Sequence, residues 1–106
     1  MIDNNKLKDL SSAKTTFIHK VEKGETIFKL AKIFHTTVEL IVKINGLTED
    51  VKSGQFVIIE KIDGVEYFVK PKDTILKIAN FSDEKRTEIV AKNKIEYVYV
   101  GQKIYI

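Results

Sequence analysis

An internal repeat constrains this chain more than any other feature of its sequence. The stretch Val21–Asn45 recurs 48 positions later, and the match resumes after a one-residue deletion, where Gly54-Gln55 corresponds to Gly101-Gln102. The matched pairs within the stretch are Val21/Val69, Thr26/Thr74, Ile27/Ile75, Ala31/Ala79, Ile41/Ile89, Val42/Val90 and Asn45/Asn93. A repeat of this length indicates two copies of one supersecondary unit, and it has to be recognised before a fold is assigned.

The composition sets the size and the broad class of these units. The chain has 106 residues, of which 43% are hydrophobic and 31% charged, as in globular proteins. Units of roughly 45 residues lie near the lower limit for a core that folds unaided, so each unit must be compact or lean on the other. The chain has no cysteine, which excludes disulfides and thiolate metal sites. Its 18 basic and 15 acidic residues are interspersed, unlike a nucleic-acid-binding surface.

The first sixteen residues are polar, and we predict that residues 1–16 form an N-terminal tail. They contain no apolar run that could form the core of a signal peptide, and no window of the chain has the length of a transmembrane helix. Two locations stay open. An exported protein would be extracellular or associated with the cell wall, whereas a cytoplasmic one would be incorporated into a larger particle.

The first unit, residues 17–60, shows alternating and helical apolar patterns in turn. We predict strands at Phe17–Val21 and Gln55–Glu60 and helices at Ile27–Phe34 and Val38–Ile44. Thr26 stands where an N-cap belongs. The second helix could be capped by Thr36, in a capping box with Glu39, or by Thr37.

The second unit, residues 66–106, repeats this order. We predict strands at Glu66–Lys70 and Lys103–Ile106 and helices at Ile75–Phe81 and Glu84–Lys92, capped by Thr74 and by Ser82 or Asp83. Residues 61–65 form a short linker, in which the pair Asp63-Gly64 favours a two-residue type I′ hairpin between the two units. A direct hairpin would leave the two units packed or stiffly joined.

Three sequence fragments, in the same order in both units, together resemble the LysM (lysin motif) family. The first is V-x-x-G-[DE]-T-[LI]-x-x-[IL]-A, the second is N-x-[LI] about fourteen residues after the alanine, and the third is G-Q-x-[LVI]-x-I. Unit one carries them as Val21–Ala31, Asn45-Gly46-Leu47 and Gly54–Ile59, and unit two as Val69–Ala79, Asn93-Lys94-Ile95 and Gly101–Ile106. The resemblance covers most of the chain.

The resemblance implies an α+β fold of two tandem βααβ units, each with two helices packed on a two-stranded antiparallel sheet. It also implies non-catalytic binding of N-acetylglucosamine-containing glycans, such as peptidoglycan or chitin, between the loop after strand one and the loop after helix two. A neutral amido sugar needs backbone groups and a small apolar contact, and glycine lets the backbone approach closely. Carried over to unit one, these binding residues are Gly24, Glu25, Thr26, Ile27, Gly46, Leu47, Thr48 and Glu49.

The second unit departs from the family pattern, and we expect a weaker site there. Lys72 replaces the turn glycine, and Pro71 before it removes a backbone donor. The corresponding residues are Lys72, Asp73, Thr74, Ile75, Lys94, Ile95, Glu96 and Tyr97. A tyrosine at 97 or 99 could stack on a sugar ring, but we predict a packed side chain instead.

No residue pattern indicates catalysis, a metal or a cofactor. The two histidines, His19 and His35, lack partners at metal-ligand or triad spacing, and we predict a packing role for His19. Glu25 and Asp73 are interpreted as supporting the helix N-termini that follow them. Asn45 and Asn93 are predicted to satisfy backbone groups where the second helix of each unit ends.

A second function, from another class, stays open at this point. The altered second unit and the lack of a visible signal peptide are also compatible with a small structural or adaptor protein. LysM units would then pack against protein subunits of a larger assembly, as in the baseplate of a phage-tail-like contractile particle or a spore coat. Neither hypothesis predicts binding to nucleic acid or insertion into a membrane.

Overall fold

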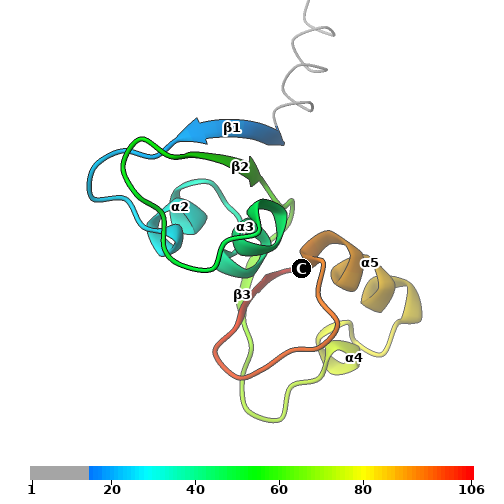
Figure 1. The fold of residues 1–106 in the computed structure, drawn as a ribbon. Coiled ribbons are helices and arrows are strands. Elements are labelled where there is room, and N and C mark those ends of the chain that lie inside the picture. Colours follow the sequence, from blue (N-terminus) through cyan, green and yellow to red (C-terminus); the bar gives the residue numbers. More distant parts are fainter. Residues whose placement is uncertain (1–14) are drawn as a thin grey trace, which may run out of the picture. The chain divides into compact units, whose positions relative to one another are not determined.

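The computed structural model describes residues 15–106, and the tail predicted for residues 1–16 therefore lies almost entirely outside the described residues. The chain divides between Lys61 and Ile62 into two compact units. Figure 1 shows that each unit has its own pair of strands and its own pair of helices.

The first unit has the order strand, helix, helix, strand. It consists of β1 (Thr16–Lys20), α2 (Ile27–Ile33), α3 (Val38–Asn45) and β2 (Phe56–Glu60). β1 and β2 pair antiparallel, with Ile18 opposite Ile58. α2 packs against α3, and α3 against β2, so that the helices lie on one face of the sheet (Figure 1). The LysM-like α+β arrangement predicted for this unit is confirmed.

Alternation along the strands and helical spacing together build the core of the first unit. Ile27, Leu30 and Ala31 form the buried stripe of α2, as the sequence predicts. Val57 and Ile59 face them from β2 and are at most 1% exposed. The side chains between them along β2 point away from the helices, because successive residues of a strand face opposite sides.

The second unit follows the same order with shorter elements. It consists of β3 (Glu66–Phe68), α4 (Ile75–Ile78), α5 (Asp83–Asn93) and β4 (Lys103–Tyr105), and β3 pairs antiparallel with β4. Its core contains Val69, Ala79, Ile89 and Ile104, which are counterparts of core residues in the first unit. The helix predicted at Ile75–Phe81 ends early, because Asn80 and Phe81 both adopt positive φ, at 55° and 60°.

The structure decides between the alternative helix caps. Thr37 caps α3 by accepting a hydrogen bond from the Leu40 N–H at 3.1 Å, so the capping box of Thr36 with Glu39 is wrong. Thr36 is fully buried instead, and its N–H bonds to the Ala31 carbonyl. In the second unit Ser82, rather than Asp83, caps α5.

The type I′ hairpin predicted between the units is also wrong. Among the strands of residues 15–106, β2 pairs only with β1, and β3 only with β4. A type I′ turn requires positive φ at both central residues, and Asp63 is not among the residues that have it. Val65 exchanges backbone hydrogen bonds with Ile106, at 2.8 and 2.9 Å, so the strand path turns toward β4 and not back along β2.

One asparagine in each unit ties the end of the second helix to the closing strand. The Asn45 amide donates to the carbonyls of Ile41 and Ile58 and accepts from the Ile58 N–H. Asn93 makes the same three bonds with Ile89 and Tyr105. The predicted role at the helix end is confirmed, and the bonds to the strand extend it.

Candidate functional site

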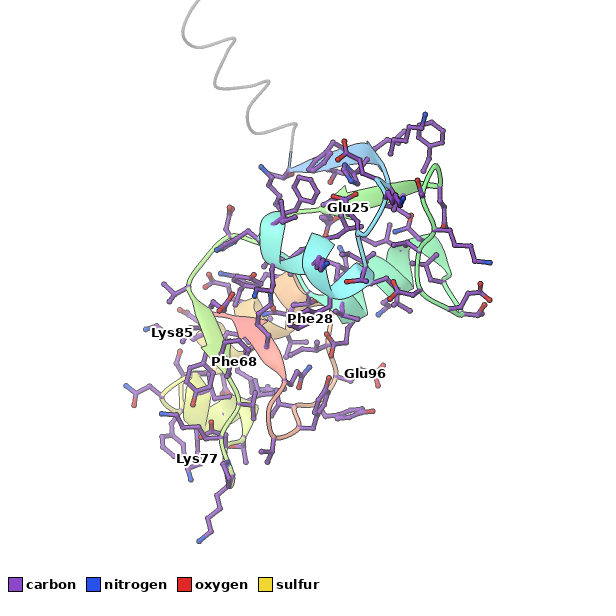
Figure 2. All side chains as sticks on the ribbon, turned by 90° about the vertical axis from the view of Figure 1, so that its left-hand side faces the viewer. Glu25, Phe28, Phe68, Lys77, Lys85 and Glu96 are labelled. Atoms are coloured by element: carbon purple, nitrogen blue, oxygen red, sulfur yellow. The ribbon has the colours of Figure 1, made fainter. Side chains whose placement is uncertain are left out.

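The loop after β1 is closed by a carboxylate. Glu25 accepts hydrogen bonds from the Glu22 N–H at 2.7 Å and from His19 Nε2 at 2.8 Å (Figure 2 labels Glu25). The backbone bond and then the imidazole bond hold the pKa of the Glu25 carboxyl below its usual range. Glu25 therefore braces the turn, and Thr26 rather than Glu25 caps α2. Support of the helix dipole by Glu25 stays a prediction. His19 also packs edge-on against Phe34, which confirms its packing role.

Asp50, which sequence reasoning missed, links the two predicted binding loops. Its Oδ1 accepts hydrogen bonds from the N–H groups of Ile27 and Val51, both at 2.8 Å. Ile27 begins α2, and Asp50 lies in the loop after α3, 23 residues further along the chain. The structure thus brings the first loop and the second loop together. In the sequence this role was marked only by an aspartate in the loop directly before the apolar residue Val51.

The predicted contact residues of the first unit differ in exposure. Thr48 and Glu49 are exposed, as are both loop glycines, Gly24 and Gly46. No atom outside the immediate chain neighbours lies within 4 Å of where a side chain would begin at either glycine. Glu25, Thr26 and Leu47 are half-buried and Ile27 is buried. Each loop therefore combines an exposed glycine with an apolar side chain, Ile27 or Leu47, that packs in or against the core.

The second unit repeats the braced turn with different side chains. Asp73 accepts from the Tyr67 hydroxyl at 2.5 Å and from the Lys70 N–H at 2.8 Å. The hydroxyl bond is the main cause of a lowered pKa at Asp73 and of a raised pKa at Tyr67. Thr74 rather than Asp73 caps α4, and support of the helix dipole by Asp73 stays a prediction. Lys72 has φ of 70° where Gly24 has 86°, so the turn keeps its left-handed backbone conformation. That conformation is unfavourable for a residue with a side chain.

The second binding loop is where the two units diverge most. Val51 of the first unit corresponds to Val98 of the second when the two loops are aligned from their C-terminal ends. Tyr97 therefore takes the position of Asp50. Tyr97 is 72% exposed and Tyr99 is 49% exposed, so the predicted packed tyrosine is wrong at both positions. Glu96 is exposed as well (Figure 2), as is Lys94, whereas Ile95 packs on the core.

Residues 15–106 hold no group of three or more His, Cys, Asp or Glu side chains placed to bind a metal ion. Among the same residues, no helix is long and apolar enough to cross a membrane.

The family comparison gives one match. Residues 19–60 match the family model of the LysM domain. The match includes β1, both helices and β2 of the first unit, together with both predicted binding loops and Asp50. The first unit is therefore similar to a LysM domain over residues 19–60, and its helices pack on a small antiparallel sheet. The match does not extend into the second unit.

The comparisons also find similar proteins. The endolysin of Bacillus phage PZA is 30% identical over 107 residues, covering 94% of this chain and 42% of the endolysin. The spore cortex-lytic enzymes SleL of Bacillus cereus and Bacillus megaterium are each 28% identical, with TM-scores of 0.42. The matched regions cover 86% and 87% of this chain, respectively, and 22% of each enzyme. The chain thus spans less than half the length of these proteins.

Proposed function

We propose that this protein binds N-acetylglucosamine-containing glycans, such as peptidoglycan, through its first unit and without catalysis. The observation that carries the proposal is the LysM match over residues 19–60, which includes both loops. The bond from Ile27 to Asp50 supports it, because a binding surface made of two loops needs them held at a fixed spacing. Gly24 and Gly46 leave backbone open beside that bond.

The carboxylates of the first unit favour binding over hydrolysis. A general acid must be protonated at the working pH, and the lowered pKa of Glu25 opposes that. Asp50 already accepts two backbone hydrogen bonds. The endolysin relative is lytic by name, and this chain corresponds to 42% of it. We therefore assign the glycan-binding role to the chain.

We propose that the second unit is a diverged LysM repeat with a weaker glycan site. The support is the shared element order, the bonds of Asn93 that match those of Asn45, and a positive φ at Lys72 as at Gly24. Its contact residues would be Lys72, Asp73, Thr74, Ile75, Lys94, Ile95, Glu96 and Tyr97. The exposed Tyr97 ring offers a stacking face where the first unit offers a carboxylate. The alternative role in a phage-tail-like particle or spore coat gains no support from the comparisons.

Co-sedimentation with insoluble peptidoglycan and with chitin tests the main proposal. Asp50→Ala removes the tether between the loops, and we expect binding to weaken roughly tenfold, equivalent to about 1.4 kcal/mol. Asp63→Ala, which removes an exposed aspartate outside both sets of predicted contact residues, is the charge-matched control and should leave the binding intact. Circular dichroism checks that both variants fold.

Two outcomes would contradict the proposal. The first is a wild-type protein that stays in the supernatant with both polymers. The second is release of new reducing ends from peptidoglycan by the purified chain, which would contradict the non-catalytic role alone.

A further inference from the structure

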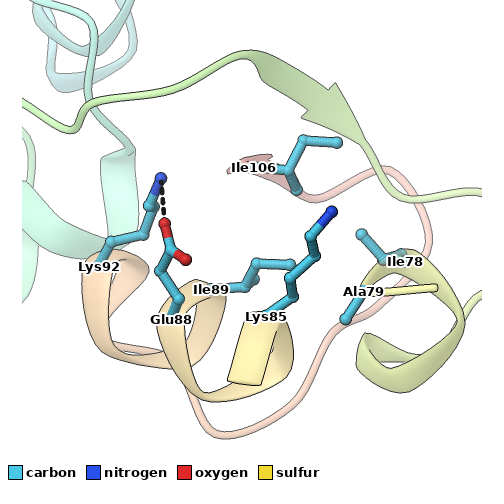
Figure 3. A pocket seen from close by; sticks show the side chains of 7 residues that line it. All are labelled: Ile78, Ala79, Lys85, Glu88, Ile89, Lys92 and Ile106. Carbon is cyan, nitrogen blue, oxygen red and sulfur yellow. Dashed lines mark ion pairs between the residues drawn. The ribbon is translucent and has the colours of Figure 1, made fainter. Parts of the chain in front are cut away.

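The second unit contains a pocket that neither predicted loop lines. Its volume is about 230 Å³, and it lies between α4, α5 and the end of β4 (Figure 3). Ile78, Ile89 and Ile106 supply apolar walls, and Lys85, Glu88 and Lys92 stand along one side on α5. The pocket is thus apolar inside with a charged rim.

Sequence differences between the units explain why this pocket belongs to the second one. At a shift of 48, Lys85, Glu88 and Lys92 correspond to Thr37, Leu40 and Ile44 of the first unit. The walls correspond to residues that pack in the first core, among them Leu30 and Ile41. Two apolar residues of α3 and the threonine that caps it are therefore replaced by three charged residues of α5. These are spaced three and four apart, so that they share one helix face.

The three charged side chains are not equally engaged. Lys92 donates to the Asp63 carbonyl at 3.2 Å and lies 3.8 Å from Glu88. Within the part of the chain that the structure describes, the Lys85 ammonium has no hydrogen bond or ion pair. Figure 3 shows it extending over the pocket beside Ile78 and Ile106. Two of these three side chains are cations and one is an anion, and the Lys85 ammonium is available to a ligand.

We propose that this pocket binds the carboxylate and the adjoining small alkyl group of a short peptide, as on the peptide side chains of peptidoglycan. Lys85 would pair with the carboxylate, and the isoleucines would contact the alkyl group. The pocket is smaller than the roughly 300–1,000 Å³ of drug-sized sites, which suits one or two amino-acid residues. The ligand class rests on the proposed wall-binding function, to which it adds a peptide contact in the second unit.

Isoleucine methyl NMR of the full chain tests the proposal. Millimolar alanyl-alanine should shift the methyl signals of Ile78, Ile89 and Ile106, and its C-terminal amide should shift them much less. Lys85→Met should weaken the dipeptide about threefold or more, as expected for loss of one partly exposed ion pair. Lys32→Met, which removes an exposed lysine of the first unit, is the charge-matched control and should have no effect.

Comparison of ligands separates this proposal from the proposed function. Chitotetraose, which has no peptide, should leave these three methyl signals unchanged, whereas a disaccharide-tetrapeptide fragment of peptidoglycan should shift them. Unchanged methyl signals with the dipeptide, or shifts that survive intact in Lys85→Met, would overturn the peptide site. Equal shifts with octanoate but none with the dipeptide would also overturn it. Binding of chitotetraose to the first unit is read from separate signals and is unaffected by these outcomes.

Discussion

The two units of this chain keep the same hydrogen bonds from side chains to the backbone, while other side chains on their surfaces differ. In both, an acid closes the first turn, an asparagine joins the second helix to the last strand, and a lysine donates to the carbonyl at the turn. The differences gather at the turn glycine, the acid of the second loop and the face of the second helix that lines the pocket in the second unit. The fold therefore depends on a small set of polar bonds, and the surfaces are free to diverge.

The largest expected effect tests those shared polar bonds. Asn93 is 1% exposed, and Asn93→Ala would leave the Tyr105 N–H and two carbonyls without their partner, at a cost of about 3 kcal/mol to the second unit. Asn45→Ala should cost less, about 2 kcal/mol, because water reaches the corresponding groups. Hydrogen exchange of amides in α5 and α3 measures each unit separately. Equal losses of stability in the two units would contradict the expectation that the more buried asparagine contributes more.

An intermediate effect concerns the turn residue that the units do not share. Lys72 adopts φ of 70°, which costs a residue with a side chain about 1 kcal/mol relative to glycine. Lys72→Gly should therefore stabilise the second unit by about that amount, and Gly24→Lys should destabilise the first by a similar amount. Thermal unfolding followed by residue-resolved NMR checks both. The comparison fails if Lys72→Gly lowers the stability of its unit.

The smallest effect is a pH dependence. The pKa of Glu25 is lowered in the folded state from an ordinary value of 4.5, so its contribution to stability is present above that value and is lost as pH falls through the lowered one. Glu25→Gln should flatten this acid limb in the first unit only. Asp73, whose pKa is also lowered, keeps the same limb in the second unit. The measurement is the midpoint of unfolding above and below pH 4.5, and an unchanged acid limb in Glu25→Gln would contradict the assignment.

Much of the fold could be predicted because repeated residues mark its boundaries. Thr26, Thr74 and the two asparagines each make a local bond at a fixed place in the helix, and such bonds can be read from spacing. The type I′ hairpin could not be rejected from Asp63-Gly64 alone, because its alternative is a pairing with Ile106, more than forty residues away. Nor could Thr36 and Thr37 be separated, since either can cap and only packing buries one of them.

The candidate site was predicted less completely than the fold. The loops themselves came from the family resemblance, but Asp50 lay one residue beyond the predicted set, and its partner is 23 residues away. The pocket beside Lys85 depends on which face of α5 turns inward, and charged residues at that spacing also describe an ordinary solvated helix. The features that could not be predicted from the sequence therefore depend mostly on contacts between residues far apart in the chain.

Residue-resolved NMR titration with chitotetraose tests the central claim most directly. The account predicts that millimolar ligand shifts the amide signals of Gly24–Ile27 and Gly46–Glu49 in the first unit, with smaller shifts in the corresponding loops of the second. Shifts confined to the second unit, or none in either unit, would contradict it.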